Sequence, residues 1–99
     1  MPKATAKING VVVAEADSWE FVEGNIYFPP SSIAKEYIGG DSDLSTRCPW
    51  KGNASYYNLT IDGKEYTNAA WYYPTPLEKA THIKDHVAFD KRQVEIIKS

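Results

Sequence analysis

Short turn sequences that favour β-hairpins constrain this chain more than any other feature. Asn9-Gly10 and Asp62-Gly63 each match a two-residue type I′ turn, in which both residues take a positive φ angle. Glu23-Gly24-Asn25 has the length of a short hairpin loop. The segments beside these turns alternate in polarity or carry β-branched side chains, as half-buried strands do. They predict three antiparallel hairpins, formed by residues 4–8 with 11–16, 18–22 with 26–28, and 55–61 with 64–73.

Two segments between the predicted strands carry helix signals. A serine pair after Pro29-Pro30 favours a helix over residues 31–38, which Gly39-Gly40 would end. Residues 75–86 begin with a capping box and place Pro76 at the first helical position, which predicts a second short helix. The composition of residues 39–47 indicates a loop. Residues 87–89 and 94–97 are typical of closing strands, joined by a charged turn at residues 90–92.

The chain length and these elements together predict one mainly β (α+β) domain over residues 1–99. We expect compact, bent antiparallel sheets with one or two short helices. Three Trp, seven Tyr and three Phe make up 13% of the chain. Aromatic side chains bury a large area each, so they can fill the core of a thin domain, and they also line binding surfaces.

Charge and cysteine content narrow the classes of partner. The formal net charge is −2, which gives no general attraction to nucleic acid or to an anionic membrane. A single cysteine, Cys48, forms no intramolecular disulfide and no cysteine-based zinc site, which fits a reducing compartment. Residues 1–7 lack the apolar core of a signal peptide, so we expect a cytoplasmic protein. His82 and His86 have helical i, i+4 spacing, but the zinc-protease pattern is absent, and we expect neither a metal nor a cofactor.

The segment from Cys48 to Gly52 (Cys-Pro-Trp-Lys-Gly) combines a thiol, a turn-forming proline, a large aromatic ring, a cation and a glycine. Arg47 and Lys51 can favour the reactive thiolate of Cys48. Alternatively, Lys51 can hold an anionic or polar group beside a wall formed by Trp50. In the structural interpretation, Cys48 is a small buried hydrophobe and Trp50 belongs to the core.

The second cluster is the aromatic run at residues 69–74, in which Trp71 and Tyr73 share one side of a predicted strand. Pairing through Asp62-Gly63 brings Tyr56 or Tyr57 opposite this run. Such cross-strand aromatic pairs stabilise a sheet. They can equally form a platform on which a flat ligand stacks.

Read together, these segments resemble a known family. Residues 22–29, the segment Cys48–Gly52 with the following Ala-Ser-Tyr-Tyr, and the Trp-Tyr-Tyr-Pro run at residues 71–74 are similar to the bacterial domain-of-unknown-function family four-two-seven. The resemblance extends from about Thr5 to Ile97 and implies a β-tent type of fold. It implies little about activity. The family is sometimes labelled nucleotidyltransferase-like, but the metal-holding carboxylates and phosphate cradle of such a site are not visible in this sequence.

The leading functional hypothesis is a small-molecule binding domain with a pocket between the Cys48–Gly52 turn and the Trp71–Tyr73 strand. Trp50 and Trp71 would form the walls, and Lys51 would meet a negative or polar group. The predicted ligand-binding residues are Cys48, Trp50, Lys51, Tyr56, Trp71 and Tyr73. Two alternatives remain: an enzyme that uses Cys48 as its nucleophile, and a homodimeric interaction protein whose exposed sheet edge or aromatic face forms the contact.

Overall fold

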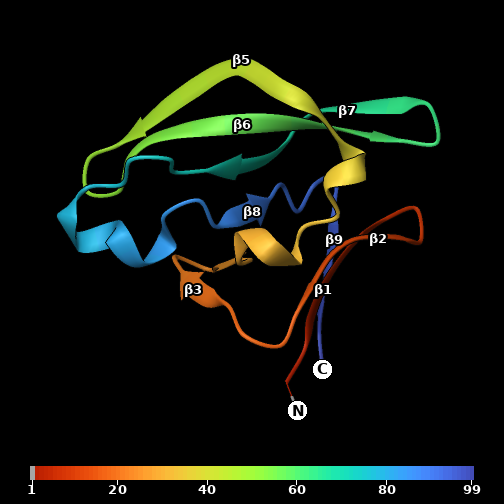
Figure 1. Ribbon diagram of the computed structural model, residues 1–99, viewed down its shortest axis with the longest axis horizontal. Coiled ribbons are helices and arrows are strands. Elements are labelled where there is room, and N and C mark those ends of the chain that lie inside the picture. Colours follow the sequence, from red (N-terminus) through yellow and green to blue (C-terminus); the bar gives the residue numbers. More distant parts are fainter. Residues whose placement is uncertain (1) are drawn as a thin grey trace.

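The computed structural model describes residues 2–99 and consists mainly of short antiparallel strands (Figure 1). The strands are β1 (Ala4–Ile8), β2 (Val11–Ala16), β3 (Glu20–Val22), β4 (Asn25–Tyr27), β5 (Ile38–Cys48), β6 (Gly52–Ile61), β7 (Lys64–Tyr72), β8 (Val87–Phe89) and β9 (Glu95–Lys98). Three short 3₁₀ segments accompany them: η1 (Pro30–Ser32), η2 (Lys35–Tyr37) and η3 (Glu78–Ile83). The predicted mainly β class with short helices is therefore confirmed.

The strands form three sheets with the orders β2-β1-β9, β3-β4 and β5-β6-β7-β8. In Figure 1, β5 and β6 arch over β8, and β5 bends strongly along its length. Two shifts in the register between β5 and β6 accompany this bend. Paired backbone hydrogen bonds between Lys3 and Ser99, of 3.1 and 2.9 Å, hold the two ends of the described chain side by side.

The predicted hairpin turns form because their residues tolerate the left-handed backbone region. Asn9 and Gly10 have φ angles of 49° and 81°, and Asp62 and Gly63 have 51° and 81°. The middle hairpin uses the same two-residue geometry at Glu23 and Gly24, with φ angles of 51° and 81°. The loop there is one residue shorter than predicted, because Asn25 already belongs to β4.

The two predicted helices are wrong in extent and type. Residues 31–38 contain the 3₁₀ segments η1 and η2 and the start of β5, and Gly39-Gly40 lies within that strand. In the second region the segment η3 begins after Leu77, and no side chain caps its start, so the predicted capping box is not formed. The backbone N–H of Leu77 instead donates to the carbonyl of Lys51 at 2.9 Å, and Ala80 has a non-helical φ of −120°. A tertiary contact therefore overrides the local helix signal.

Two further predictions need correction. Residues 39–47 form most of the edge strand β5 rather than a loop, because β6 supplies their hydrogen-bond partners. The closing strands β8 and β9 both exist, but they do not pair with each other: β8 pairs with β7, and β9 pairs with β1. The turn between them therefore carries the chain from one sheet to another. Every peptide bond among residues 2–99 is trans, including the Tyr73–Pro74 bond.

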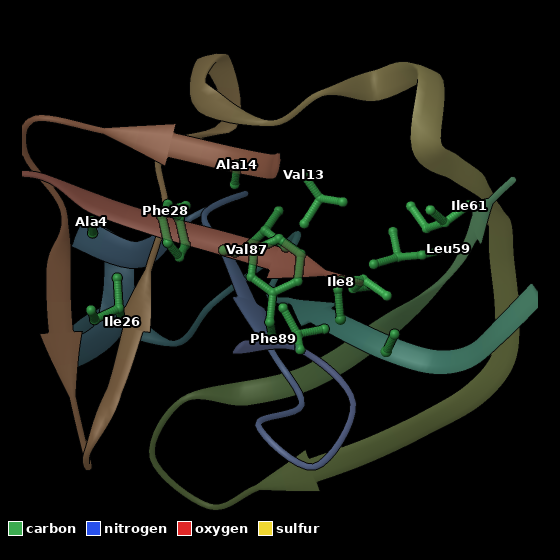
Figure 2. Packing of buried hydrophobic residues seen from close by; sticks show 14 residues of the cluster. Ala4, Ile8, Val13, Ala14, Ile26, Phe28, Leu59, Ile61, Val87 and Phe89 are labelled. Atoms are coloured by element: carbon green, nitrogen blue, oxygen red, sulfur yellow. The ribbon is translucent and has the colours of Figure 1, made fainter. Parts of the chain in front are cut away.

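The main hydrophobic core lies between the sheets and draws side chains from most of them (Figure 2). Phe28, which follows β4, and Phe89 at the end of β8 meet edge-to-face with their ring centroids 5.5 Å apart. Backbone hydrogen bonds of 2.8 and 2.9 Å between Phe28 and Val87 connect the β3–β4 hairpin to β8. A second cluster of buried residues surrounds Tyr27 and Tyr73 and lies beneath the Cys48–Gly52 turn.

We expect Phe28→Ala to lower the free energy of unfolding by about 3 to 5 kcal/mol, because this fully buried ring would leave a cavity. Urea denaturation followed by circular dichroism measures this change. Phe21→Ala is the matched control, since that ring is 60% exposed and its loss should change stability by less than about 1 kcal/mol. Equal losses in the two variants would contradict the position of the core.

Candidate functional site

The segment Cys48–Gly52 forms the tight loop between β5 and β6, with Cys48 and Gly52 paired at the strand ends. Gly52 has a φ of 108°, which an L side chain rarely adopts. A β-carbon at this position would lie 3.3 Å from the carbonyl oxygen of Thr75. The glycine thus allows the segment from Thr75 to Leu77 to pack directly on the loop.

Lys51 is the unusual residue of this loop, because it is only 7% exposed. Its ammonium group forms an ion pair with the carboxylate of Glu23 at the tip of the β3–β4 hairpin. The indole Nε1–H of Trp50 donates to the other carboxylate oxygen at 3.4 Å. The Nζ atom of Lys51 also lies 5.4, 5.6 and 6.0 Å from the ring centroids of Tyr73, Trp50 and Tyr27.

These contacts fix the charge state of the pair. Burial alone would lower the pKa of Lys51, but the hydrogen bond to Glu23 and the neighbouring Tyr27 and Tyr73 outweigh it, so this pKa is raised. The hydrogen bonds from Lys51 and Trp50 lower the pKa of Glu23. At neutral pH the lysine is therefore a permanent cation and the glutamate an anion.

An aromatic wall begins beside this pair. Tyr56 on β6 and Trp71 on β7 lie directly opposite each other in the sheet, with their ring centroids 6.3 Å apart. The indole Nε1–H of Trp71 donates to the buried Tyr27 hydroxyl at 3.2 Å. The Tyr56 hydroxyl is hydrogen-bonded to the Thr46 hydroxyl at 3.0 Å. Both rings are half-buried, so each keeps part of its surface in contact with solvent.

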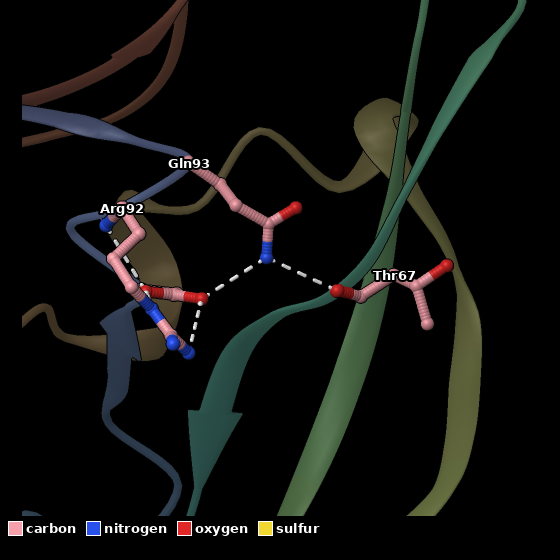
Figure 3. Close-up of polar contacts among 4 residues, drawn as sticks. Thr67, Arg92 and Gln93 are labelled. Carbon is pink, nitrogen blue, oxygen red and sulfur yellow. Dashed lines mark hydrogen bonds and ion pairs between the residues drawn. The ribbon is translucent and has the colours of Figure 1, made fainter.

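A polar wall comes from the turn after β8 (Figure 3). Asp90 accepts hydrogen bonds from Arg92 and from the Gln93 side-chain amide, which also donates to the Thr67 carbonyl at 3.1 Å. Burial would raise the pKa of Asp90, but the donors on Arg92 and Gln93 lower it, so Asp90 is ionised. The network fixes this turn against β7.

Both walls line an open groove with a volume of about 560 Å³. Its lining combines aromatic, charged and uncharged polar side chains with one leucine, and we call it the aromatic groove. The lining residues are Leu44, Lys51, Tyr56, Thr67, Asn68, Trp71, Tyr73, Asp90, Arg92 and Gln93.

The structure brings four of the six sequence-predicted residues to this groove: Lys51, Tyr56, Trp71 and Tyr73. Trp50 is not part of its lining but lies 36% exposed against Glu23, so it does not form the wall that the sequence suggested. Cys48 is half-buried and packs against the second hydrophobic cluster. The reactivity of its thiol stays a prediction.

Sequence reasoning missed the residues that complete the site. Glu23 and Tyr27 reach it from a hairpin more than twenty positions away in the sequence. Asn68, which lines the groove, lies where the register shifts between β6 and β7 and has a φ of 55°. Its backbone N–H donates to Asn58 Oδ1. The charged turn after residue 89 was visible in the sequence, but nothing there indicated that it lines the same groove as Trp71.

Across residues 2–99, no three or more His, Cys, Asp or Glu side chains gather closely enough to hold a metal ion. The ring Nδ1 of His86 lies 3.0 Å from the Lys84 carbonyl oxygen. No helical segment in this range is both long and apolar enough to cross a bilayer.

The fold and the site define a small, mainly β domain with an aromatic groove lined by strands β5, β6 and β7 and by the turn after β8. The chain belongs to the family described as Domain of unknown function (DUF427), whose model matches residues 3–99. This match confirms the family resemblance seen in the sequence. No curated protein matches the chain.

We expect Glu23→Gln to lower the thermal midpoint at pH 7, because the buried Lys51 ammonium would lose its anionic partner. The Glu23 pKa is lowered in the folded state, so its contribution to stability is full above the ordinary value of 4.5. That contribution is lost as the pH falls through the lowered folded value. The difference in midpoint between wild type and variant should therefore narrow from pH 7 to pH 3.

Thermal denaturation at both pH values measures this difference. Glu65→Gln, at an exposed position on β7, is the control and should change the midpoint little at either pH. A Glu23→Gln deficit that is the same at pH 3 as at pH 7 would contradict the ionic role of Glu23.

Proposed function

We propose that this domain binds a small planar molecule with a negative or strongly polar group in the aromatic groove. The observation that carries this proposal is the convergence of Tyr56, Trp71 and Tyr73 with the buried cation of Lys51 on one groove. Small-molecule sites commonly have volumes of about 300 to 1,000 Å³ and combine apolar walls with a few placed polar groups. The groove volume of about 560 Å³ falls in this range.

The charges of the lining support the same ligand class. Lys51 and Arg92 are cations, and Asp90 is the one acid of the lining. Hydrogen bonds from Arg92 and Gln93 already occupy the Asp90 carboxylate. Both hydrogens of the Gln93 side-chain amide are also used, for Asp90 and the Thr67 carbonyl. Asn68 and Arg92 keep side-chain donors in the lining, and a ligand that stacks on Trp71 can direct an acceptor or a carboxylate toward them.

Lys51 would serve this site as a fixed cation and not as a nucleophilic amine. A lysine nucleophile needs a lowered pKa, so that part of it is neutral at physiological pH. The Lys51 pKa is raised, and its ammonium group is held by Glu23. Binding and orientation of an acceptor group are the roles that this geometry supports.

Two-dimensional ¹⁵N–¹H NMR with three probes tests the proposal. Indole-3-carboxylate is planar and anionic, indole is planar and neutral, and cyclohexanecarboxylate is anionic but not planar. We expect indole-3-carboxylate to bind about tenfold more tightly than either partial mimic, because only it uses both the stacking wall and the cation. The largest shifts should fall on Asn68, on the Trp71 indole and on the Gln93 side-chain amide.

Adjacent tyrosines on β6 provide a matched pair of variants. Tyr56 lines the groove, whereas Tyr57 stacks on Tyr72 with a centroid distance of 4.3 Å and is not part of the groove lining. Tyr56→Leu should weaken binding of indole-3-carboxylate at least about fivefold, and Tyr57→Leu should not. The proposal fails if no probe shifts the groove residues, or if the two variants weaken binding equally.

A further inference from the structure

A second hollow, which shares no lining residue with the aromatic groove, lies between the β3–β4 hairpin and β9. Its volume is about 260 Å³. Ile26 and Phe89, which are 7% and 2% exposed, supply buried apolar surface, and Phe21 and Ile96 add two more apolar side chains. Phe21 is 60% exposed, so a large part of its ring contacts water.

All the charged residues that line this hollow are lysines, and the hairpin positions both of them. The Lys91 ammonium donates to the carbonyl of Gly24 at 3.1 Å. The Lys98 Nζ lies 5.4 Å from the centroid of the Phe21 ring. Within residues 2–99, neither lysine forms an ion pair with a carboxylate. An ammonium group has three donors, so Lys91 keeps two for another acceptor.

We propose that this hollow binds a medium-chain fatty acid, with the hydrocarbon chain against Phe21, Ile26 and Phe89 and the carboxylate between Lys91 and Lys98. The two cations complement a carboxylate, and hydrogen bonds between an ammonium and a carboxylate are strong when the site is partly shielded from water. The apolar floor and the exposed Phe21 ring complement a hydrocarbon chain. The volume lies below that of sites for drug-sized ligands, which favours a medium chain over a long one.

Isothermal titration calorimetry with hexanoate, octanoate and decanoate, each below the concentration at which it forms micelles, tests the proposal. We expect the affinity to rise about threefold to fourfold for each methylene that the hollow buries, until the hollow is full. Octan-1-ol has the same chain as octanoate without its charge, and should bind at least about fivefold more weakly. An affinity that does not depend on chain length or on charge would overturn the proposal.

Variants locate the site, and all of them change exposed side chains, so that the fold should be kept. Lys91→Gln combined with Lys98→Gln should weaken octanoate binding about tenfold. Phe21→Ala should weaken both octanoate and octanol. Lys79→Gln, at an exposed position outside the hollow, should leave both affinities unchanged.

Two outcomes separate this site from other kinds of anion binding. If Lys79→Gln weakens octanoate binding as much as the double lysine variant, attraction to the general surface charge explains the result and the proposal is wrong. Sedimentation with vesicles of phosphatidylglycerol tests a membrane surface as the partner. Binding to these vesicles without binding to any of the three fatty acids would also overturn the proposal.

Discussion

The buried ammonium group of Lys51 imposes the constraint on which the arrangement of the sheets depends. A charge that leaves water must find an opposite charge or other strong partners. For Lys51 that partner is Glu23, at the tip of a hairpin 28 residues earlier in the chain. The β3–β4 hairpin must therefore lie against the β5–β6 loop. The same hairpin contains Tyr27, whose hydroxyl accepts the hydrogen bond from the Trp71 indole. It leads into Phe28, whose backbone pairs with Val87 on β8.

This constraint also determines what the aromatic groove can do. The ring centroids of three aromatic side chains lie 5.4 to 6.0 Å from the Lys51 ammonium, and the more exposed Glu23 carboxylate forms an ion pair with it. The two partners differ in exposure, because the Lys51 side chain is 9% exposed and that of Glu23 is 53% exposed. The cation is thus fixed while its counter-ion can exchange contacts with water. An anionic group that enters the groove meets a positive charge which neither moves away nor loses its proton at neutral pH.

The fold was predictable from the sequence where the φ angles of a few adjacent residues determine the local structure. Asn9-Gly10 and Asp62-Gly63 form the predicted turns, because both residues of each pair accept a positive φ angle without a tertiary partner. Prediction failed where a distant segment supplies the hydrogen bonds. Residues 39–43 have low β propensity but lie in β5, where Gly40 and Asp41 pair with Asn58 and Tyr57 of β6. The predicted helix after Thr75 is shortened because the Leu77 N–H bonds to Lys51.

In the candidate site, too, some contacts were predictable from the sequence and others were not. The sequence could place Tyr56 or Tyr57 opposite the aromatic run, because a hairpin turn joins β6 and β7. It could not decide which residue meets Trp71, because a register shift between Tyr57 and Leu59 moves Tyr56 from a position opposite Ala69 to one opposite Trp71. Glu23 could not be placed, since the contact that brings it to Lys51 joins two hairpins, and no periodicity within either one specifies it. The same argument applies to Trp50. Trp50 lies beside Lys51 and donates to the same Glu23 carboxylate, but this contact with a distant hairpin leaves the indole outside the groove lining. Strand-pairing rules can therefore predict contacts between neighbouring strands of one sheet. The site also depends on contacts between separate sheets, which these rules do not predict.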